Sequence, residues 1–341
     1  MQKQDLRIVF MGTPEFAVAT LQALVENGYQ VVAVVTQPDK PVGRHGSVLQ
    51  PSAVKQYALA HGLPVLQPEK MKDPEFVEQL RDYQANLQVV VAFRMLPEVV
   101  WAMPQYGTFN VHAALLPQYR GAAPINWAVI NGETVTGVTT FFLDHDIDTG
   151  RIIMQKSFDI PDDADVEYVY DGLMHLGADI CLQTLDAIVR ADGHPQTTAQ
   201  ADYVSPSGNG QPSAPENSSS LILHSPLKPA PKIFKETCEI RWQQSAKQVY
   251  DFVRGLSPYP GAWTTLVSAD GKETTLKVFR TRKTGRPAQR VGSLLVEGRS
   301  LYVSAADELL ELVELQLAGK KRMTARDFLN GMKDIGACRV G

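Results

Sequence analysis

Asn110 and His112 are two positions apart in the segment GTFNVH (107–112), whose pattern predicts a strand. Because side chains alternate between the two faces of a strand, Asn110 and His112 share one face. The apolar turn Ala-Ala-Leu-Leu-Pro follows the strand directly. On spacing alone, the two residues are either a catalytic pair or a polar pair whose hydrogen bonds are satisfied inside the core.

A second set of polar residues lies in FFLDHDIDTGRII, after a predicted strand over 136–144. If this strand runs parallel to 107–112, the carboxyl ends of both meet at one edge of the sheet, and a carboxylate of the loop reaches His112. A carboxylate beside an imidazole fixes its tautomer and stabilises its charged form. The Asn110 amide can donate to a developing oxyanion, and with no Ser or Cys nucleophile beside it the set suits direct attack of an amine on a carbonyl. The carboxylates of the loop are Asp144, Asp146 and Asp148.

The segment VAFRMLP (91–97) ends another predicted strand with an apolar and aromatic turn. Such a turn either holds a flat heterocycle through its backbone amides and carbonyls or is simply the buried end of a strand. No cluster with the spacing of metal ligands accompanies these segments. His145 between Asp144 and Asp146 is best explained as loop polarity.

The elements that must position these residues alternate along the chain up to residue 191. Val- and Ile-rich runs alternate with helical patterns, which indicates a mainly parallel sheet covered by helices on both faces. This part of the chain is therefore expected to have an α/β fold. The predicted strands are 7–12, 30–37, 64–67, 87–93, 107–112, 136–144 and 151–160, and a long helix is predicted over 165–191.

The composition changes after residue 204. The segment SPSGNGQPSAPENSSS (205–220) contains almost no apolar residues and is typical of a flexible linker. Beyond it, one helix over 245–255 precedes short strand-like segments separated by turn residues, which predict a small barrel. A chain of 341 residues also favours two domains over one.

The net charge of −4 is divided unevenly. From Pro226 onward the chain has 20 Lys and Arg against 12 Asp and Glu, a balance of +8, so residues 1–225 carry −12. A basic module suggests a polyanionic partner, although a solvated surface explains the excess equally well. Three widely spaced cysteines without a CxxC pair, no signal peptide and no apolar run of about 20 residues lead us to expect the cytoplasm.

Five segments together resemble the methionyl-tRNA formyltransferase family over nearly the whole chain, apart from the linker. The central block is specific for folate-dependent formyl transfer, and the early loop with the C-terminal module narrows the resemblance to the tRNA enzymes. It implies a Rossmann-like formyltransferase domain with a mainly parallel sheet over 1–204, a flexible linker over 205–225, and a basic, OB-like β-barrel that binds tRNA over 226–341. The five segments are residues 7–20, TQPDKPVGR, NVHAALLPQYRGAAPINWAVINGE, TGVTTFFLDHDIDTG and LQLAGKKRM.

The resemblance implies that the formyl group of 10-formyltetrahydrofolate passes to the methionine amine of initiator methionyl-tRNA, without a metal. Asn110, His112 and Asp148 match the family's catalytic residues. The family usually has Ser before Leu-Leu-Pro, where this chain has Ala114, so a side-chain hydroxyl is missing beside the site. The residues expected to contact the folate are Phe93, Arg94, Met95, Leu96, Ala114, Leu115, Leu116, Pro117 and Asp144.

The tRNA contacts implied by the resemblance are basic. Arg44 matches a basic position in the loop over 38–52, which resembles the segment that wedges against the tRNA acceptor end. The densest cationic group of the C-terminal module, here named the KKR cluster, makes phosphate contacts that render binding salt-sensitive. A second basic cluster is either a phosphate-binding surface or a set of solvated side chains. The KKR cluster is Lys320, Lys321 and Arg322, and the second basic cluster is Arg280, Arg282, Lys283 and Arg286.

Two other functions are compatible with parts of the pattern. The same chemistry on a small acceptor, such as an amino sugar nucleotide or a glycinamide ribonucleotide, needs neither the basic module nor the long early loop. A non-catalytic tRNA- or folate-binding protein of the same fold has no need of Asn110, His112 and Asp148, although Ala114 gives it some support. For formyl transfer to tRNA, we expect a monomer that does not bind membranes.

Overall fold

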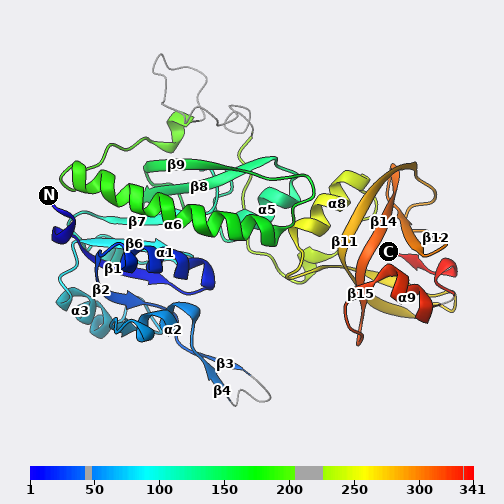
Figure 1. Cartoon of the computed structure of the whole chain (residues 1–341), viewed down its shortest axis with the longest axis horizontal. Coiled ribbons are helices and arrows are strands. Elements are labelled where there is room, and N and C mark those ends of the chain that lie inside the picture. Colours follow the sequence, from blue (N-terminus) through cyan, green and yellow to red (C-terminus); the bar gives the residue numbers. More distant parts are fainter. Residues whose placement is uncertain (43–47, 204–225, 333) are drawn as a thin grey trace. The chain divides into compact units, whose positions relative to one another are not determined.

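The computed structural model of this chain describes residues 1–42, 48–203, 226–332 and 334–341 (Figure 1). The linker predicted over 205–225 and Arg44 therefore lie outside the described residues. The chain divides into two compact units, each assembled from three segments. The first unit comprises Met1–Gly121, Val135–Asp159 and Tyr170–Pro229, and the second comprises Ala122–Thr134, Ile160–Val169 and Ala230–Gly341.

The first unit is built on a seven-stranded sheet in the order β5-β2-β1-β6-β7-β8-β9. The first five of these strands are parallel, which confirms the mainly parallel sheet, while β8 is antiparallel to both β7 and β9. Every residue of β6 is buried, as expected for an apolar strand covered on both faces. The strands are β1 Arg7–Gly12, β2 Gln30–Val35, β5 Val65–Leu66, β6 Leu87–Val91, β7 Thr108–His112, β8 Val135–Phe142 and β9 Ile152–Asp159.

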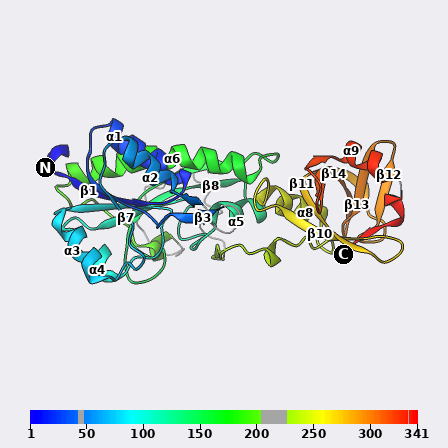
Figure 2. The same ribbon diagram turned by 90° about the horizontal axis from the view of Figure 1, so that it is seen from below.

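Helices cover both faces of this sheet, with α1 and α6 on one face and α3 and α4 on the other (Figure 2). Gly177 of α6 lies against Val111 of β7. Because neighbouring strand residues point to opposite faces, Asn110 and His112 face away from α6. The helices are α1 Glu15–Glu26, α2 Ala53–Ala60, α3 Pro74–Asp82, α4 Glu98–Trp101 and α6 Val166–Arg190. A separate hairpin, β3 Lys40–Val42 and β4 Val48–Gln50, lies within the loop predicted over 38–52.

The second unit contains an antiparallel sheet in the order β12-β13-β14-β11-β10-β16, with β15 paired to β14. A bridge between Ser293 and Arg339 joins its two edges, and the Val340 N–H donates to the Gly292 carbonyl at 2.9 Å. A Cβ at Gly292 would lie 2.3 Å from the Val340 carbonyl oxygen, so this closure requires glycine. The curled sheet agrees with the predicted small barrel. Its strands are β10 Ala262–Val267, β11 Glu273–Pro287, β12 Leu294–Glu297, β13 Ser300–Ser304, β14 Glu308–Leu317, β15 Met323–Thr324 and β16 Arg339–Val340.

Helix α8 (Ala246–Gly255) packs on the core of this sheet and holds segments from earlier in the chain. The buried Asp251 carboxylate of α8 accepts from Arg254 at 2.8 Å, and Arg254 donates to the Ala164 carbonyl at 2.8 Å. Helix α5 (Pro124–Ile130) packs against the same core through its last residue. The second unit therefore includes the helix that follows the apolar turn after β7. A further helix, α9, spans Ala325–Gly331.

The three cysteines are buried free thiols. In the described part of the chain, no group of three or more His, Cys, Asp or Glu side chains is arranged to hold a metal ion. Across the same residues, no helix combines the length and the apolar character needed to cross a membrane.

Candidate active site

Strand β7 carries both residues of the predicted catalytic pair. The His112 side chain is buried, and Asn110 is half-buried. Asn110 Oδ1 is buried and accepts no hydrogen bond from any described residue. A buried amide oxygen without a donor destabilises a folded protein, so it needs an explanation. The Asn110 amide is thus a group that is available to a bound molecule.

The His112 ring is held through Nε2, which lies 2.9 Å from the carbonyl oxygen of Tyr119. Because a carbonyl only accepts, Nε2 carries a proton and Nδ1 is the nitrogen left for other contacts. Nδ1 faces the Asp148 carboxylate, with 3.9 Å between Nδ1 and Oδ2. This distance suits an ion pair with a protonated ring but is too long for a direct hydrogen bond. The tautomer is therefore fixed by the Tyr119 carbonyl and not, as the sequence suggests, by the carboxylate.

Asp148 reaches this position by a different route from the expected one. Strand β8 runs antiparallel to β7, with Thr139 opposite His112, so its carboxyl end lies beside the amino end of β7. The expectation that two parallel strands present both groups at one edge is therefore wrong. Instead, the loop after β8 returns toward the turn that follows β7, where the Gly121 N–H donates to Asp148 Oδ2 at 2.9 Å.

Gln200 holds the loop in this position. Its buried side chain donates to the carbonyls of Asp148 and Gly150 at 2.8 and 2.9 Å, and it accepts two hydrogen bonds from the Arg120 guanidinium. Asp148 has a φ of +56°, a left-handed backbone that only a few residue types adopt readily, aspartate among them. The position of this carboxylate therefore depends on a glutamine that no sequence pattern identifies.

The turn over 113–121, here named the catalytic turn, is held by polar residues of β8 and β9. Thr139 Oγ1 donates to the Ala114 carbonyl at 2.6 Å and accepts from the Leu116 N–H at 3.1 Å. Gln155 donates to the Leu116 carbonyl at 2.7 Å and to Thr139 Oγ1 at 2.9 Å. Ala114 is completely buried, and its backbone is fixed without a side-chain hydroxyl. Neither Thr139 nor Gln155 stands out in the sequence. The strand register aligns both with His112, because Thr139 pairs with His112 on β7 and with Gln155 on β9.

The segment predicted to border the folate, 93–96, follows β6. Parallel pairing of Val91 with Val111 brings it to the edge of the sheet at which His112 lies. The Arg94 guanidinium donates to the carbonyls of Pro68 and Glu69, and its burial lowers its pKa. Leu96 belongs to the hydrophobic core and the half-buried Phe93 packs against it, whereas Met95 is 72 % exposed. Asp144, the remaining predicted folate residue outside the catalytic turn, is exposed and accepts from Thr149 at 2.7 Å.

The two basic clusters of the second unit differ in their partners. Each cation of the second basic cluster forms an ion pair, whereas no described residue pairs with Lys320 or Lys321. Arg322, the third member of the KKR cluster, pairs with Glu314 and lies over the Phe279 ring at 4.4 Å. The ion pairs of the second basic cluster are Arg280–Glu314, Arg282–Glu311, Lys283–Asp162 and Arg286–Glu297.

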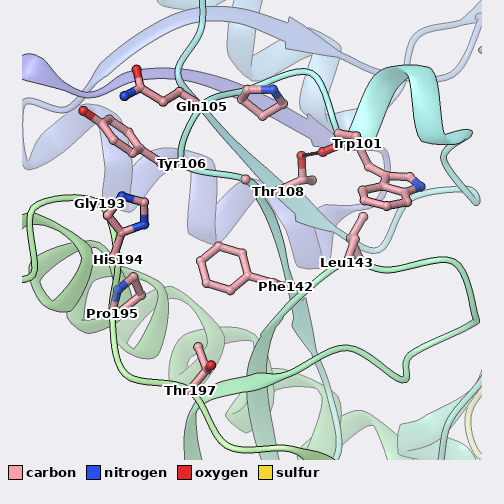
Figure 3. Close-up of a pocket in the computed structure, with 13 residues that line it drawn as sticks. Trp101, Gln105, Tyr106, Thr108, Phe142, Leu143, Gly193, His194, Pro195 and Thr197 are labelled. Carbon is pink, nitrogen blue, oxygen red and sulfur yellow. Dashed lines mark hydrogen bonds between the residues drawn. The ribbon is translucent and has the colours of Figure 1, made fainter.

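A cavity of about 380 Å³ lies at the amino end of β7 (Figure 3). None of the described residues that the sequence predicts for the site lines this cavity. Its wall includes Thr108, which shares a face of β7 with Asn110 at a distance along the strand of about 7 Å. The cavity is therefore close to the face that carries the polar pair. The aromatic and imidazole rings in its wall are Trp101, Tyr106, Phe142 and His194.

The fold is that of a formyl transferase. The family model described as formyl transferase matches residues 6–185, and the model for the formyl transferase C-terminal domain matches residues 232–333. The methionyl-tRNA formyltransferase of Parabacteroides distasonis is 58 % identical over 345 residues and covers 100 % of both chains. That of Bacteroides fragilis is 53 % identical over 333 residues, or 97 % of this chain and 96 % of the relative. The chain belongs to the methionyl-tRNA formyltransferase family.

Solved structures share the fold at low identity. HypX from Aquifex aeolicus, solved in complex with tetrahydrofolic acid, has a TM-score of 0.59 and 17 % identity over 95 % of this chain and 47 % of its own. The sugar 3N-formyl transferase WlaRD, solved in the presence of dTDP and 5-N-formyl-THF, has a TM-score of 0.58 and 16 % identity over 93 % of this chain and 99 % of its own. The same fold thus occurs in a protein that is named for a sugar acceptor.

Proposed function

We propose that this protein transfers the formyl group of 10-formyltetrahydrofolate to the α-amino group of methionine on initiator methionyl-tRNA, giving N-formylmethionyl-tRNA for translation initiation. The observation that carries the proposal is the geometry at β7. There, an amide oxygen without a partner among the described residues shares a strand face with an imidazole that has one nitrogen on a backbone carbonyl and the other toward a carboxylate. The relatives' names supply the acceptor, and the folates with which the fold neighbours were solved supply the class of donor. The protein acts in the cytoplasm as a monomer.

The reaction begins when the neutral methionine amine attacks the formyl carbon, and the carbonyl electron pair moves onto oxygen. The Asn110 amide N–H and protonated Nδ1 of His112 donate to this oxyanion. Each such donor contributes roughly 3–4 kcal/mol to the transition state in well-studied enzymes. The Tyr119 carbonyl holds the other ring nitrogen, so the ring cannot turn its Nδ1 away. Asn110 Oδ1, which has no partner in the described part of the chain, is placed to accept from the incoming amine.

The protons must balance as the tetrahedral intermediate collapses. The amine nitrogen loses one proton, and the N10 nitrogen of the folate gains one when its bond to the formyl carbon breaks. The Asp148 carboxylate accepts the first proton, because it is the anion that faces the site 3.9 Å from His112 Nδ1. It then returns a proton to N10, so neither the enzyme nor the solvent changes its net charge over the cycle.

We also propose that the folate ring lies against the segment 93–96 and the catalytic turn, which follow the carboxyl ends of the paired strands β6 and β7. Met95→Trp, at an exposed position of this segment, should raise KM for the folate about tenfold and leave KM for tRNA unchanged. Ala60→Trp, at an exposed position at the end of α2, is the control. Equal KM values for the folate in both variants would contradict this placement.

The decisive experiment compares acceptors. The protein is incubated with labelled 10-formyltetrahydrofolate and either charged initiator tRNA, an amino sugar nucleotide or glycinamide ribonucleotide, and label transfer is measured. Transfer to charged tRNA, with rates at least a hundredfold lower for both small amines, is expected. Preferred transfer to a small amine would exclude the proposed acceptor. No transfer to any acceptor, with tRNA or folate binding intact, would identify a non-catalytic binding protein.

A further inference from the structure

A short segment from the far side of the linker runs along the catalytic turn. This segment, residues 226–231, is here named the strap. The Tyr119 N–H donates to the Lys228 carbonyl at 2.7 Å, and the Lys228 N–H donates to Gln118 Oε1 at 2.8 Å. Further along, the N–H groups of Ala122 and Ala123 both donate to the carbonyl of Ala230, at 2.7 and 3.1 Å. The strap is therefore hydrogen-bonded to the catalytic turn and to the two residues after it, although more than 100 residues separate these segments in the sequence.

Tyr119 is the residue at which the strap and the catalytic histidine meet. Its φ of +61° is in the left-handed region, which a bulky residue rarely adopts. Its N–H is bonded to the strap, and its carbonyl oxygen is bonded to His112 Nε2. A rotation of the Tyr119 backbone out of this conformation would turn both groups, so the bond to the strap helps to keep the carbonyl directed at the ring.

We propose that the strap is a positioning element of the active site, and that Gln118 is the positioning residue that anchors it. The buried Gln118 is 1 % exposed and accepts a hydrogen bond from the strap. It is part of the catalytic turn and directly precedes Tyr119. It acts through Tyr119 on the direction of the His112 ring, and so on whether Nδ1 faces the reacting carbonyl. The effect of the strap on kcat rests on the proposed formyl transfer, whereas its effect on the direction of the His112 ring does not.

The test removes the anchor while keeping its volume. Gln118→Leu leaves the Lys228 N–H without this acceptor and should lower kcat by ten- to a hundredfold, because small misplacements of a catalytic group have effects of that size. KM for tRNA and for the folate should change less than threefold. The control is Asn86→Leu, since Asn86 also accepts a backbone N–H, from Arg7 at 2.8 Å, and donates to a distant carbonyl, that of Asp5. Its kcat should stay within twofold of the parent.

A second readout does not depend on activity. In ¹⁵N-labelled protein, the parent should show a His112 Nε2–H that is hydrogen-bonded and slow to exchange, and Gln118→Leu should show a faster exchange of this proton. Gln118→Glu retains an oxygen for the Lys228 N–H and should recover part of both properties.

If Gln118→Leu fails to fold, Gln118→Glu and the parent spectrum carry the test. An unchanged kcat, or a His112 Nε2–H that is unaffected in a folded variant, would overturn the role of the strap. Loss of His112 protection in a protein that formylates nothing would support the strap and reject only the proposed function.

Discussion

The active site and the barrel surface arrange their polar groups in opposite ways. In the active site, buried groups are joined by directed hydrogen bonds, such as those that Thr139 and Gln155 make to the catalytic turn. In the second basic cluster, exposed cations are paired with carboxylates, as in Arg282–Glu311. Buried hydrogen bonds fix geometry, whereas an exposed ion pair contributes at most about 1 kcal/mol and is screened by salt. Changes in the first region should therefore alter kcat by large factors at any salt concentration, and changes in the second should be small and salt-dependent.

The same comparison shows what a charge count leaves out. The chain from Pro226 onward has an excess of positive charge and contains both basic clusters, yet the second basic cluster is matched by acidic residues on neighbouring elements. Lys320 and Lys321 are not matched in this way by any described residue. A cation without a carboxylate partner can contact phosphate without breaking an ion pair first. Among these basic groups, the KKR cluster is thus the better candidate for tRNA contacts.

The largest expected effect belongs to His112→Ala. Removal of the imidazole takes away one oxyanion donor and the group that faces Asp148, so kcat should fall by about a thousandfold or more. The loss should be equal at low and high salt, because the interactions are buried. Single-turnover formylation at both salt concentrations measures it. His175→Ala, at an exposed position on α6, should be indistinguishable from the parent. A loss of less than tenfold in His112→Ala would remove this residue from the mechanism.

The next largest effect is expected at Asn110. Asn110→Ala should lower kcat by about a hundredfold, the usual effect of losing one oxyanion donor. Because the variant removes a buried oxygen to which no described residue donates, its Tm should be no more than about 2–4 °C below that of the parent. Thr139→Val is the contrasting variant: it removes a hydroxyl with three hydrogen bonds and should lower Tm further. If Asn110→Ala proves the less stable of the two, its side chain has a structural role instead.

The parallel sheet could be predicted from the sequence because Val- and Ile-rich runs alternate with helices, and the pair on β7 could be placed on one face by spacing alone. The direction of β8 could not. Residues 113–134 separate β7 from β8, a connection long enough for either direction, and hydrophobic periodicity is the same in both. His112 and Asp148 were expected to meet, and they do, but through the Gly121 and Gln200 contacts of a returning loop.

The residues that support the site cannot be identified from the sequence, for a related reason. Tyr119, Gln118 and Gln200 act through backbone groups, and their partners are far away in the sequence, so no local pattern identifies them. Tyr119 was not expected to have a left-handed backbone, because that conformation is set by its tertiary contacts rather than its side chain. The hairpin β3–β4 and the short helix α9 were not predicted either. Each is too short to give a clear periodic signal.

A smaller effect, and the sharpest separation of the two basic clusters, is expected from tRNA binding. Replacing both Lys320 and Lys321 by alanine should lower the slope of log Kd against log salt by about 1.5, since each phosphate contact contributes roughly 0.7–0.9. The matched variant replaces Arg282 and Arg286, which removes the same charge from ion-paired positions. It should leave the slope nearly unchanged. Equal reductions in both double variants would show that ion pairing does not distinguish the clusters.

The smallest effect is expected from the Asp162–Lys283 ion pair. The Asp162 Oδ2 and Lys283 Nζ atoms are 2.6 Å apart, and the side chains are 63 % and 35 % exposed. The hydrogen bond from Lys283 lowers the pKa of Asp162 below its ordinary value. A lowered pKa in the folded state means that the pair stabilises the fold above the unfolded-state pKa of about 4. This contribution is lost as the pH falls through the folded-state pKa.

Because both partners are exposed, Asp162→Asn should cost less than about 1 kcal/mol at pH 7. The corresponding fall in Tm is at most about 4 °C. Calorimetry at pH 7 should show this difference at low salt and a smaller one in high salt, and the difference should shrink as the pH falls below about 4. Asp163→Asn, at the exposed neighbouring position, is the control and should not respond to salt in this way. A much larger, salt-independent loss in Asp162→Asn would mean that the barrel surface shares the directed bonding of the active site, and the contrast between the two regions would fail.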